Sequence, residues 1–590
     1  MSKVVNNPGS KTIFKSVTEH LSFIYPELDI DQITSQAIDA IGVSPTQEVL
    51  PQHKNKWSEK DAWVITYGDT LTNNDEAPLK TLKRFSDTYL KDVISGIHIL
   101  PFFPYSSDDG FSVINYAQVN DSLGSWDDIK DIASEYDLMA DLVINHCSQR
   151  SQWFENFKQN KDPGRDYFFQ TNPSENLGDV VRPRTSSLLR ETQTTDGVKH
   201  VWCTFSHDQV DLNFANPDVF IEMVKIVRGY LEQGVRIFRL DAVAFLWKEV
   251  GTDCIHLPQT HEFVRLFRTL IEAHTEDAIV ITETNVPNHE NLSYFGNANE
   301  AHAVYNFSLP PLLLHAFATG NAEYLQRWQM SMPPAQTGTF YFNFVASHDG
   351  IGLRPAKDLL SESDLDQLIN TMQSFGGRIS WRSASGGKNE AYEINIALFD
   401  AMQGTLEGPD RWQKERFLCA HAIMCALEGV PGIYIHSLLA TQNDYAKVEL
   451  TNQNRSINRT KWDYPELVEK LEDKSSHNSR VLLSLTQLLE KRTSQPAFHP
   501  NAIQYTLHLG KNVFAFWRQS INRDQSIFCI FNVTNKQVSI PLSSVNLISN
   551  ELWVDLNTGT EYSGNEESLE LAPCGFVWLT NKDFSVKDFS

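Results

Sequence analysis

Apolar residues gather in short runs that recur along most of the chain, and a longer amphipathic segment follows each run. Runs of this kind span residues 62–66, 95–102, 138–146, 234–242, 278–284, 303–307, 340–349 and 430–436. Strands that are apolar throughout, rather than alternating, are typical of parallel sheets covered on both faces. Eight alternating strand and helix units therefore predict an α/β fold, a (β/α)8 TIM barrel.

Two connections in this pattern are too long for ordinary loops between a strand and a helix. We interpret residues 147–210 as an inserted domain B and residues 350–403 as an inserted loop subdomain B′ over the same face of the barrel. The barrel itself then takes residues 61–146, 211–349 and 404–500.

The two ends of the chain have different patterns. Residues 1–60 predict an N-terminal helical extension, in which Ile30, Ile33, Ala37 and Ile41 repeat at helical spacing between an Asp29 N-cap and a Gly42 stop. Residues 501–590 alternate apolar and polar positions in short runs, which predicts a C-terminal antiparallel β domain.

Charge narrows the possible partners. Of 590 residues, 41% are hydrophobic and 21% charged, as in a folded protein, while 50 Lys and Arg against 74 Asp and Glu give a net charge of −24. Such a field repels nucleic acid and anionic membranes, so we expect neither as a partner. An anionic substrate would need a local positive pocket.

The chain has no run of about 18 apolar residues, and its first residues lack the pattern of a signal peptide. The seven cysteines are odd in number and contain no CxxC pair, so we interpret them as buried apolar residues of a reducing compartment. These features predict a cytoplasmic protein. The sequence does not decide between a monomer and a homodimer, and we expect one of the two.

Charged residues stand at the ends of several predicted strands. Asp241, Glu283 and Asp349 end three runs, accompanied by Arg239 and by two histidines, His146 and His348. Each alone could be a strand-end cap or an ion-pair partner. Catalytic residues of TIM barrels lie at the carboxyl ends of strands, and a pair of carboxyl groups, one ionised and one protonated, is what glycoside cleavage requires.

Four motifs add a family resemblance. DLVINH (141–146), VRIFRLDAV (235–243), ITETN (281–285) and FVASHDG (344–350) resemble, in order, the four short motifs of the α-amylase superfamily, glycoside hydrolase family 13. Further segments are similar to its sucrose-phosphorylase branch, among them RPR (182–184), FSHDQVDLN (205–213) and NRSINR (454–459). Within that branch GTDCIHLPQTH (251–261) and AYEIN (391–395) most resemble glucosylglycerate phosphorylases.

The resemblance implies a retaining double displacement. Asp241 would be the nucleophile, Glu283 the general acid and then base, and Asp349 a group that binds the glucose and stabilises the transition state. Arg239 would keep Asp241 ionised. The other residues that the resemblance implies at the glucose are His146, His348, Asp69 and Arg455.

The same resemblance implies a phosphate as the second reactant. Arg184 and Tyr392 match phosphate-contacting positions, Phe205 would form an apolar wall on the acceptor side, and Glu393 stands where sucrose phosphorylases carry Gln. Asn145 matches a calcium-binding position of amylases, but the branch generally lacks that ion. We expect no metal and no cofactor; inorganic phosphate is a co-substrate.

Several hypotheses stay open at this point. The first is phosphorolysis of 2-O-α-D-glucosylglycerate to α-D-glucose 1-phosphate. The second is the same reaction on sucrose, sucrose 6-phosphate or glucosylglycerol. The protein could also be a hydrolase or transglucosidase that does not use phosphate, or a barrel without catalytic activity. A glycerate carboxylate would need a further cation in the acceptor pocket. The inserted segments offer Arg190, Arg354, Arg378, Arg382 and Lys388, of which we expect one or two to reach it.

Overall fold

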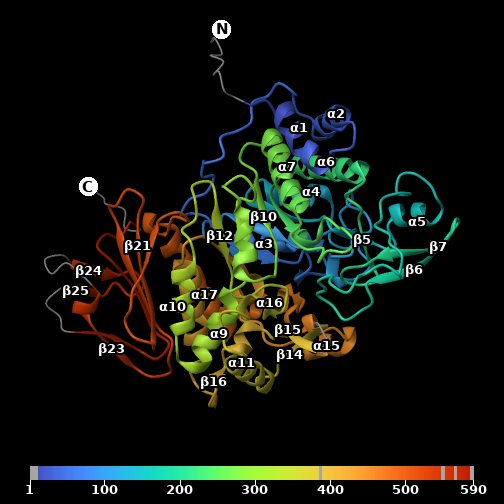
Figure 1. The fold of residues 1–590 in the computed structure, drawn as a ribbon. Coiled ribbons are helices and arrows are strands. Elements are labelled where there is room, and N and C mark those ends of the chain that lie inside the picture. Colours follow the sequence, from blue (N-terminus) through green and yellow to red (C-terminus); the bar gives the residue numbers. More distant parts are fainter. Residues whose placement is uncertain (1–10, 384–388, 546–551, 564–567, 585–590) are drawn as a thin grey trace, which may run out of the picture.

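The computed structural model describes residues 11–383, 389–545, 552–563 and 568–584 (Figure 1). Eight parallel strands close into a barrel in the order β1, β18, β12, β11, β10, β9, β4 and β3. Their bounds are Trp63–Thr66 (β1), Gly96–Ile99 (β3), Asp137–Val143 (β4), Val235–Asp241 (β9), Ile279–Thr282 (β10), Ala303–Tyr305 (β11), Phe340–Asn343 (β12) and Val430–Tyr434 (β18). Each of the eight apolar runs forms one barrel strand, so the predicted fold class is confirmed.

Large apolar side chains fill the barrel. Trp63 of β1 stacks on Phe342 of β12 with ring centroids 5.5 Å apart, and both are buried. Gly432 of β18 makes room for this pair, because a Cβ atom there would lie 2.2 Å from Cζ of Phe342. Packing of this kind makes the barrel a solid core, which leaves its rim as the place for chemistry.

Helices follow the strands and cover the outside of the barrel (Figure 1). Several begin at a proline, whose fixed φ suits the first helical turn. The longer ones are α3 (Pro78–Tyr89), α4 (Trp126–Ala133), α6 (Pro217–Glu232), α7 (Pro258–His274), α9 (Leu309–Thr319), α10 (Glu323–Ser331), α13 (Gln413–Ala426), α16 (Tyr464–Glu472) and α17 (His477–Thr493).

Two helices form the described part of the N-terminal extension, α1 (Ile13–Ile24) and α2 (Ile30–Ile41). The side chain of Asp29 accepts a hydrogen bond from the backbone N–H of Gln32, and Gly42 ends α2 with φ 79°, so the predicted start and stop of this helix are confirmed. The pair packs on α7 and α6 of the barrel. His20 of α1 contacts Glu262 of α7, with Nδ1 2.5 Å from Oε1. The extension is thus anchored to the barrel by a buried apolar face and a polar contact.

The two long insertions carry small sheets of their own. Strand β5 (His146–Ser148) pairs with β8 (Gln209–Asp211), which ties the two ends of the first insertion together, and α5 (Gln152–Lys158), β6 (Leu189–Thr194) and β7 (Gly197–Trp202) lie between them. The second insertion contains α11 (Glu362–Ser374) and a sheet of β13 (Ile351–Gly352), β15 (Asn389–Asn395) and β14 (Arg378–Ser383).

The last part of the chain folds as antiparallel sheets beside the barrel (Figure 1). A six-stranded sheet has the order β20 (Ile503–Thr506), β21 (Val513–Gln519), β22 (Ser526–Asn532), β27 (Phe576–Thr580), β24 (Leu552–Asp555) and β25 (Glu561–Ser563), and β23 (Val538–Pro541) pairs with β26 (Ser568–Leu571). Its own buried apolar cluster includes Phe528 and Trp553. The domain boundaries remain our interpretation of these elements. Among the described residues, no helix combines the length and the apolar character needed to cross a membrane.

Candidate active site

A pocket opens over the carboxyl ends of the barrel strands, where both insertions meet the barrel. Most of the residues predicted from the sequence line it: Asp241, Glu283, Asp349, His146, His348, Phe205, Arg455, Arg184 and Tyr392. They come from strand ends and from insertions far apart in the sequence. The fold therefore gathers the candidate catalytic, glucose-binding and phosphate-binding groups in one place.

Arg239 lies beneath the pocket rather than in its lining. Its guanidinium is buried, and Nη1 donates to Oδ1 of Asp241 at 2.8 Å and also to Asp141. On the other side of Asp141, Oδ2 lies 2.7 Å from Nε2 of His98. This arrangement holds a positive charge directly against Asp241 from below. Arg239 thus acts on the carboxylates of the pocket rather than facing a ligand in it.

The pKa values of the two carboxyl groups predicted for catalysis are both raised. Burial raises the pKa of Asp241, with Arg239 opposing the shift and Glu283 adding to it. Burial also raises the pKa of Glu283, again against Arg239 and with the help of Asp349. Since Arg239 lies 2.8 Å from Asp241 but 3.9 Å from Glu283, the charge belongs on Asp241 and the shared proton on Glu283. One ionised and one protonated carboxyl group is the state that a retaining glycosidase uses.

The backbone directly after Asp241 is strained. Ala242 has φ 51°, a left-handed conformation that is unusual for a residue with a side chain. This turn aims its N–H at Glu283, whose Oε2 accepts the bond at 3.1 Å. The strain therefore serves to couple the positions of the two carboxyl groups, as backbone outliers at functional sites often do.

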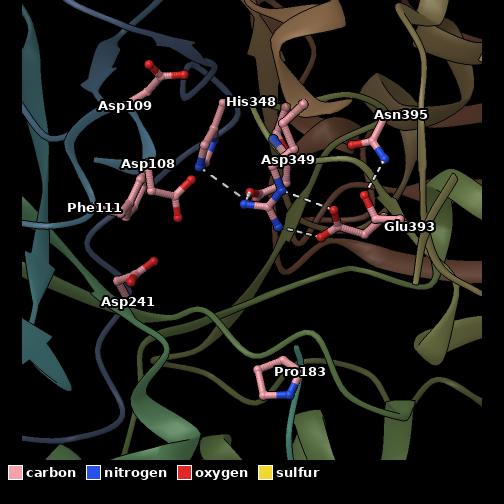
Figure 2. Close-up of polar contacts among 12 residues, drawn as sticks. Asp108, Asp109, Phe111, Pro183, Asp241, His348, Asp349, Glu393 and Asn395 are labelled. Carbon is pink, nitrogen blue, oxygen red and sulfur yellow. Dashed lines mark hydrogen bonds and ion pairs between the residues drawn. The ribbon is translucent and has the colours of Figure 1, made fainter. Parts of the chain in front are cut away.

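Asp349 is held ionised on the far side of the pocket. Nη1 of Arg455 lies 2.7 Å from its Oδ1, and the same guanidinium donates Nε and Nη2 to Glu393 at 3.0 and 2.5 Å. Burial would raise the pKa of Asp349, but the charge of Arg455 and its neighbours outweighs burial and holds it below its usual range. Figure 2 shows Asp349 and Glu393 on one side of the site, facing Asp108 and Asp241. Glu393 is thus used to hold Arg455, which explains a buried carboxylate at this position.

Both predicted histidines are buried and neutral. Burial lowers the pKa of His348 to about 3, and its ring stacks on Phe111 with centroids 5.1 Å apart. Burial also lowers the pKa of His146, whose Nε2 lies 2.9 Å from the carbonyl oxygen of Phe111. Neutral imidazole rings are better suited to hydrogen bonds with uncharged sugar hydroxyls than to salt bridges with charged groups.

The two insertions contribute two arginines, Arg184 and Arg354, to the lining of the pocket. Arg184 lies over the rings of Phe205 and Tyr392, at 5.7 and 5.6 Å from their centroids, and among the described residues it pairs with no carboxylate. Of the five cations considered for the acceptor, Arg190, Arg378 and Arg382 lie outside this lining, and Lys388 falls outside the described residues.

The lining of this pocket does not include Asp69. Its carboxylate pairs with Lys461 and lines a neighbouring cavity. Asp108 lines the catalytic pocket instead. Asp108 is thus a carboxylate of the pocket that the sequence prediction did not include, and the role of Asp69 at the glucose stays a prediction.

Asn145 is the position that resembles a calcium ligand of amylases, and its side chain binds a cation of the protein itself, the ammonium group of Lys248. The buried Nζ of Lys248 donates to Oδ1 of Asn145 at 2.8 Å and lies 3.0 Å from Oδ2 of Asp211. Within the described ranges, no group of three or more His, Cys, Asp and Glu is arranged to hold a metal ion. The Lys248 ammonium thus neutralises Asp211 at the root of the first insertion.

The chain is similar to known proteins in sequence and in fold. Residues 86–351 match the family model of the α-amylase catalytic domain. The chain is 42% identical to the glucosylglycerate phosphorylase of Spirochaeta thermophila over 95% of this chain and 98% of that protein, and 40% identical to that of Escherichia coli over 90% and 94%. The chain belongs to the glucosylglycerate phosphorylase family, a branch of glycoside hydrolase family 13. The crystal structure of sucrose 6F-phosphate phosphorylase from Thermoanaerobacter thermosaccharolyticum superposes with a TM-score of 0.70 at 25% identity, covering 80% of this chain and 94% of that one.

Sequence reasoning missed residues that reach the pocket through loops. Asp108 and Phe111 follow β3, but several residues beyond its end, where the chain folds back over the barrel mouth. His98 lies within β3 itself, and its signal was an isolated polar residue in an apolar strand. Attention to strand ends alone therefore finds the candidate catalytic carboxylates of this family member but not the groups that loops add.

Proposed function

We propose that this protein is a retaining α-glucoside phosphorylase that releases α-D-glucose 1-phosphate from 2-O-α-D-glucosylglycerate. The observation that carries the proposal is Arg184, an arginine for which the described part of the chain supplies no carboxylate partner. It lies in the same pocket as the ionised and protonated carboxyl groups of Asp241 and Glu283. Membership in the glucosylglycerate phosphorylase family supports the choice of substrate. No cofactor is needed, since phosphate is itself a reactant.

In the first step a carboxylate oxygen of Asp241 attacks the anomeric carbon of the glucosyl unit. The bond from that carbon to the glycerate oxygen breaks, and Glu283 gives its proton to the departing oxygen. Asp349, Arg455, His348 and Asp108 hold the sugar while positive charge develops on its ring. The product of this step is a β-glucosyl ester of Asp241.

In the second step a phosphate oxygen attacks the same carbon and the ester bond to Asp241 breaks. Glu283, now ionised, takes the proton from the incoming phosphate. Two inversions retain the α configuration. Arg184 suits phosphate because its planar fork donates two parallel hydrogen bonds, and Tyr392 adds a hydroxyl beside it.

Other donors of the branch are the second candidate. Sucrose, sucrose 6-phosphate or glucosylglycerol would be cleaved by the same two steps, and the superposed sucrose 6F-phosphate phosphorylase shares the fold. The pocket carries a second arginine, Arg354, beside Arg184. A second cation favours an anionic leaving group over uncharged fructose or glycerol.

A panel of donors tests the proposal. Purified protein is incubated with inorganic phosphate and, in turn, glucosylglycerate, sucrose, sucrose 6-phosphate or glucosylglycerol, and the α-D-glucose 1-phosphate formed is measured. We expect glucosylglycerate to give the highest kcat/KM by at least about tenfold, the effect of one charge-assisted contact. A higher value with another donor would move the assignment to that donor, and glucose as the main product would make the protein a hydrolase.

Arg184→Ala tests the phosphate site. We expect the phosphorolysis rate at fixed phosphate to fall about 10- to 150-fold, because a charge-assisted hydrogen bond is lost, while hydrolysis of the glucosyl ester by water continues. The ratio of glucose 1-phosphate to glucose, measured on one sample, reports the effect independently of enzyme concentration. Arg190→Ala is the matched control, because Arg190 lies over Phe154 of the first insertion and bonds the carbonyl oxygen of His207. An unchanged product ratio in Arg184→Ala would remove Arg184 from the phosphate site.

We also propose a cytoplasmic location. The seven cysteines are all buried and unpaired, as expected for a protein of a reducing compartment.

A further inference from the structure

Arg354 differs from Arg455, another arginine of the pocket lining, in that fewer of its hydrogen-bond donors have partners. It begins the short 3-10 helix Arg354–Ala356 directly after β13, and the preceding Leu353 donates its N–H to the carbonyl oxygen of Tyr392 at 3.0 Å. Nη2 donates to Oε2 of Glu290 at 3.4 Å, a long contact. Arg455, in contrast, is paired on both sides by Asp349 and Glu393. Arg354 therefore keeps donors for a ligand in the pocket.

Glu290 is itself held by a histidine. Nε2 of His256 lies 3.0 Å from Oε2 of Glu290, and Nδ1 of His256 lies 2.8 Å from the hydroxyl of Tyr294. One neutral tautomer satisfies both contacts, with Nε2–H donating to Glu290 and Nδ1 accepting from Tyr294, and burial lowers the pKa of His256. Since His256 and Arg354 share one carboxylate oxygen, Glu290 orients Arg354 without saturating it.

The loop that supplies His256 is strained. Cys254 and His256 have φ of 53° and 55°, and the N–H of His256 donates to the carbonyl oxygen of Ala244, a residue of the pocket lining, at 2.9 Å. Strain of this kind persists where the surrounding structure fixes a side chain in one place. The segment is the GTDCIHLPQTH motif (251–261), which has no role in the two displacement steps.

We propose that Arg354 binds the carboxylate of the acceptor acid, and that Glu290 and His256 are positioning residues for it. The inference rests on the proposed function and names the residue that selects a small hydroxycarboxylate over a neutral polyol. The physical reason is that glycerol would leave the guanidinium of Arg354 without a charged ligand in a half-buried pocket. A site built for such a group discriminates strongly against analogues that lack it.

The reverse reaction tests the selection. With α-D-glucose 1-phosphate as donor, glycerate and glycerol are compared as acceptors for the unmodified protein, Arg354→Gln and the control Arg382→Gln. Arg382 is matched to Arg354 in that its side chain is 17% exposed, against 16%, and pairs with one glutamate, Glu390, outside the pocket. We expect Arg354→Gln to lower kcat/KM for glycerate about 10- to 150-fold and to leave glycerol within about threefold. Arg382→Gln should change neither.

The positioning role is tested by KM and kcat separately. Glu290→Ala should raise the KM for glycerate about 2- to 10-fold with little change in kcat, because the transition state at the sugar is untouched. Glu290→Gln keeps an acceptor oxygen for Arg354 and should restore most of the affinity. Hydrolysis of α-D-glucose 1-phosphate without acceptor serves as the measure of folding, since it needs Asp241 and Glu283 but not Arg354.

The outcomes separate this inference from the proposed function. If the unmodified protein does not prefer glycerate, the proposed function fails. If it does prefer glycerate and Arg354→Gln keeps that preference, Arg354 is not the carboxylate ligand. Equal losses for glycerate and glycerol, with intact hydrolysis, would also overturn the inference. A KM unchanged in Glu290→Ala, or no recovery in Glu290→Gln, would overturn the positioning role alone.

Discussion

Asp241→Asn should abolish turnover, with kcat for phosphorolysis falling by at least about 10³-fold. Asparagine has the same shape, and its Oδ1 could still accept the 2.8 Å bond from Arg239. What it loses is the negative charge that makes the oxygen a nucleophile. The substitution also leaves Arg239 paired with Asp141, so the buried guanidinium keeps a carboxylate partner and the fold should persist.

Asp69→Asn makes the same chemical change at a second carboxylate and tests its predicted role at the glucose. This carboxylate pairs with Lys461 and lies outside the lining of the pocket. Its effect on kcat should stay below about fivefold, the scale of one exposed ion pair. A loss in Asp69→Asn as large as that in Asp241→Asn would mean that the placement of Asp69 outside the site is wrong. Turnover by Asp241→Asn within about tenfold of the unmodified protein would remove Asp241 as nucleophile.

Glu283→Gln should stop the reaction at a defined point. Cleavage of glucosylglycerate should fall by about 10²- to 10⁴-fold, the usual contribution of a general acid, because the alkoxide leaving group needs a proton. A donor with a good leaving group, α-glucosyl fluoride, needs no proton, so it should still form the glucosyl ester on Asp241. Since the base for the second step is also missing, the ester should accumulate and be visible by mass spectrometry as one added glucosyl unit. Azide, a nucleophile without a proton to lose, should release it.

The raised pKa of Glu283 gives this variant a second readout. Burial disfavours the ionised form, so the stability that the protonated group contributes is present at low pH and is lost as pH rises through the pKa of the folded state. Glutamine has no proton to lose. Glu283→Gln should therefore unfold at a higher temperature than the unmodified protein at pH 8, with a smaller difference at pH 5. Each unit of pKa shift corresponds to about 1.4 kcal/mol.

The activity profile should change in the same direction. For the unmodified protein, kcat/KM for glucosylglycerate should fall on the alkaline side as Glu283 loses its proton, and the residual activity of Glu283→Gln should lack that limb. An alkaline limb that survives in Glu283→Gln would assign the titration to another group. Equal unfolding temperatures at both pH values would show that Glu283 is not buried as the structure has it.

The pattern of apolar residues was sufficient for the fold class. All eight barrel strands, the helix after Asp29 and the main strands of the C-terminal sheets appear where the periodicity predicts them. The reason is local: a strand covered on both faces must be apolar along its whole length, and a helix covered on one face must repeat every three to four residues. The candidate catalytic carboxylates could also be located from the sequence, because the parallel strands of a barrel bring their carboxyl ends to one rim.

The positions of side chains on loops could not be predicted from strand ends. Asp69 follows β1 by only three residues, yet the chain turns its carboxylate toward Lys461. Asp108 lies nine residues beyond the end of β3 and still reaches the pocket. Distance from a strand end along the sequence therefore does not predict distance from the site, because a loop's path depends on what it packs against.

Tertiary contacts also determine which carboxylate each arginine pairs with. Among the cations considered for the acceptor, the sequence offers Arg354 and Arg382 as equivalent candidates, and nothing in their spacing separates them. In the folded protein Arg455 is paired by Asp349 and Glu393 and Arg382 by Glu390, whereas Arg184 faces the pocket with no carboxylate partner among the described residues. Whether an arginine is available to a ligand depends on which carboxylates the fold brings within reach, and those carboxylates come from distant parts of the chain.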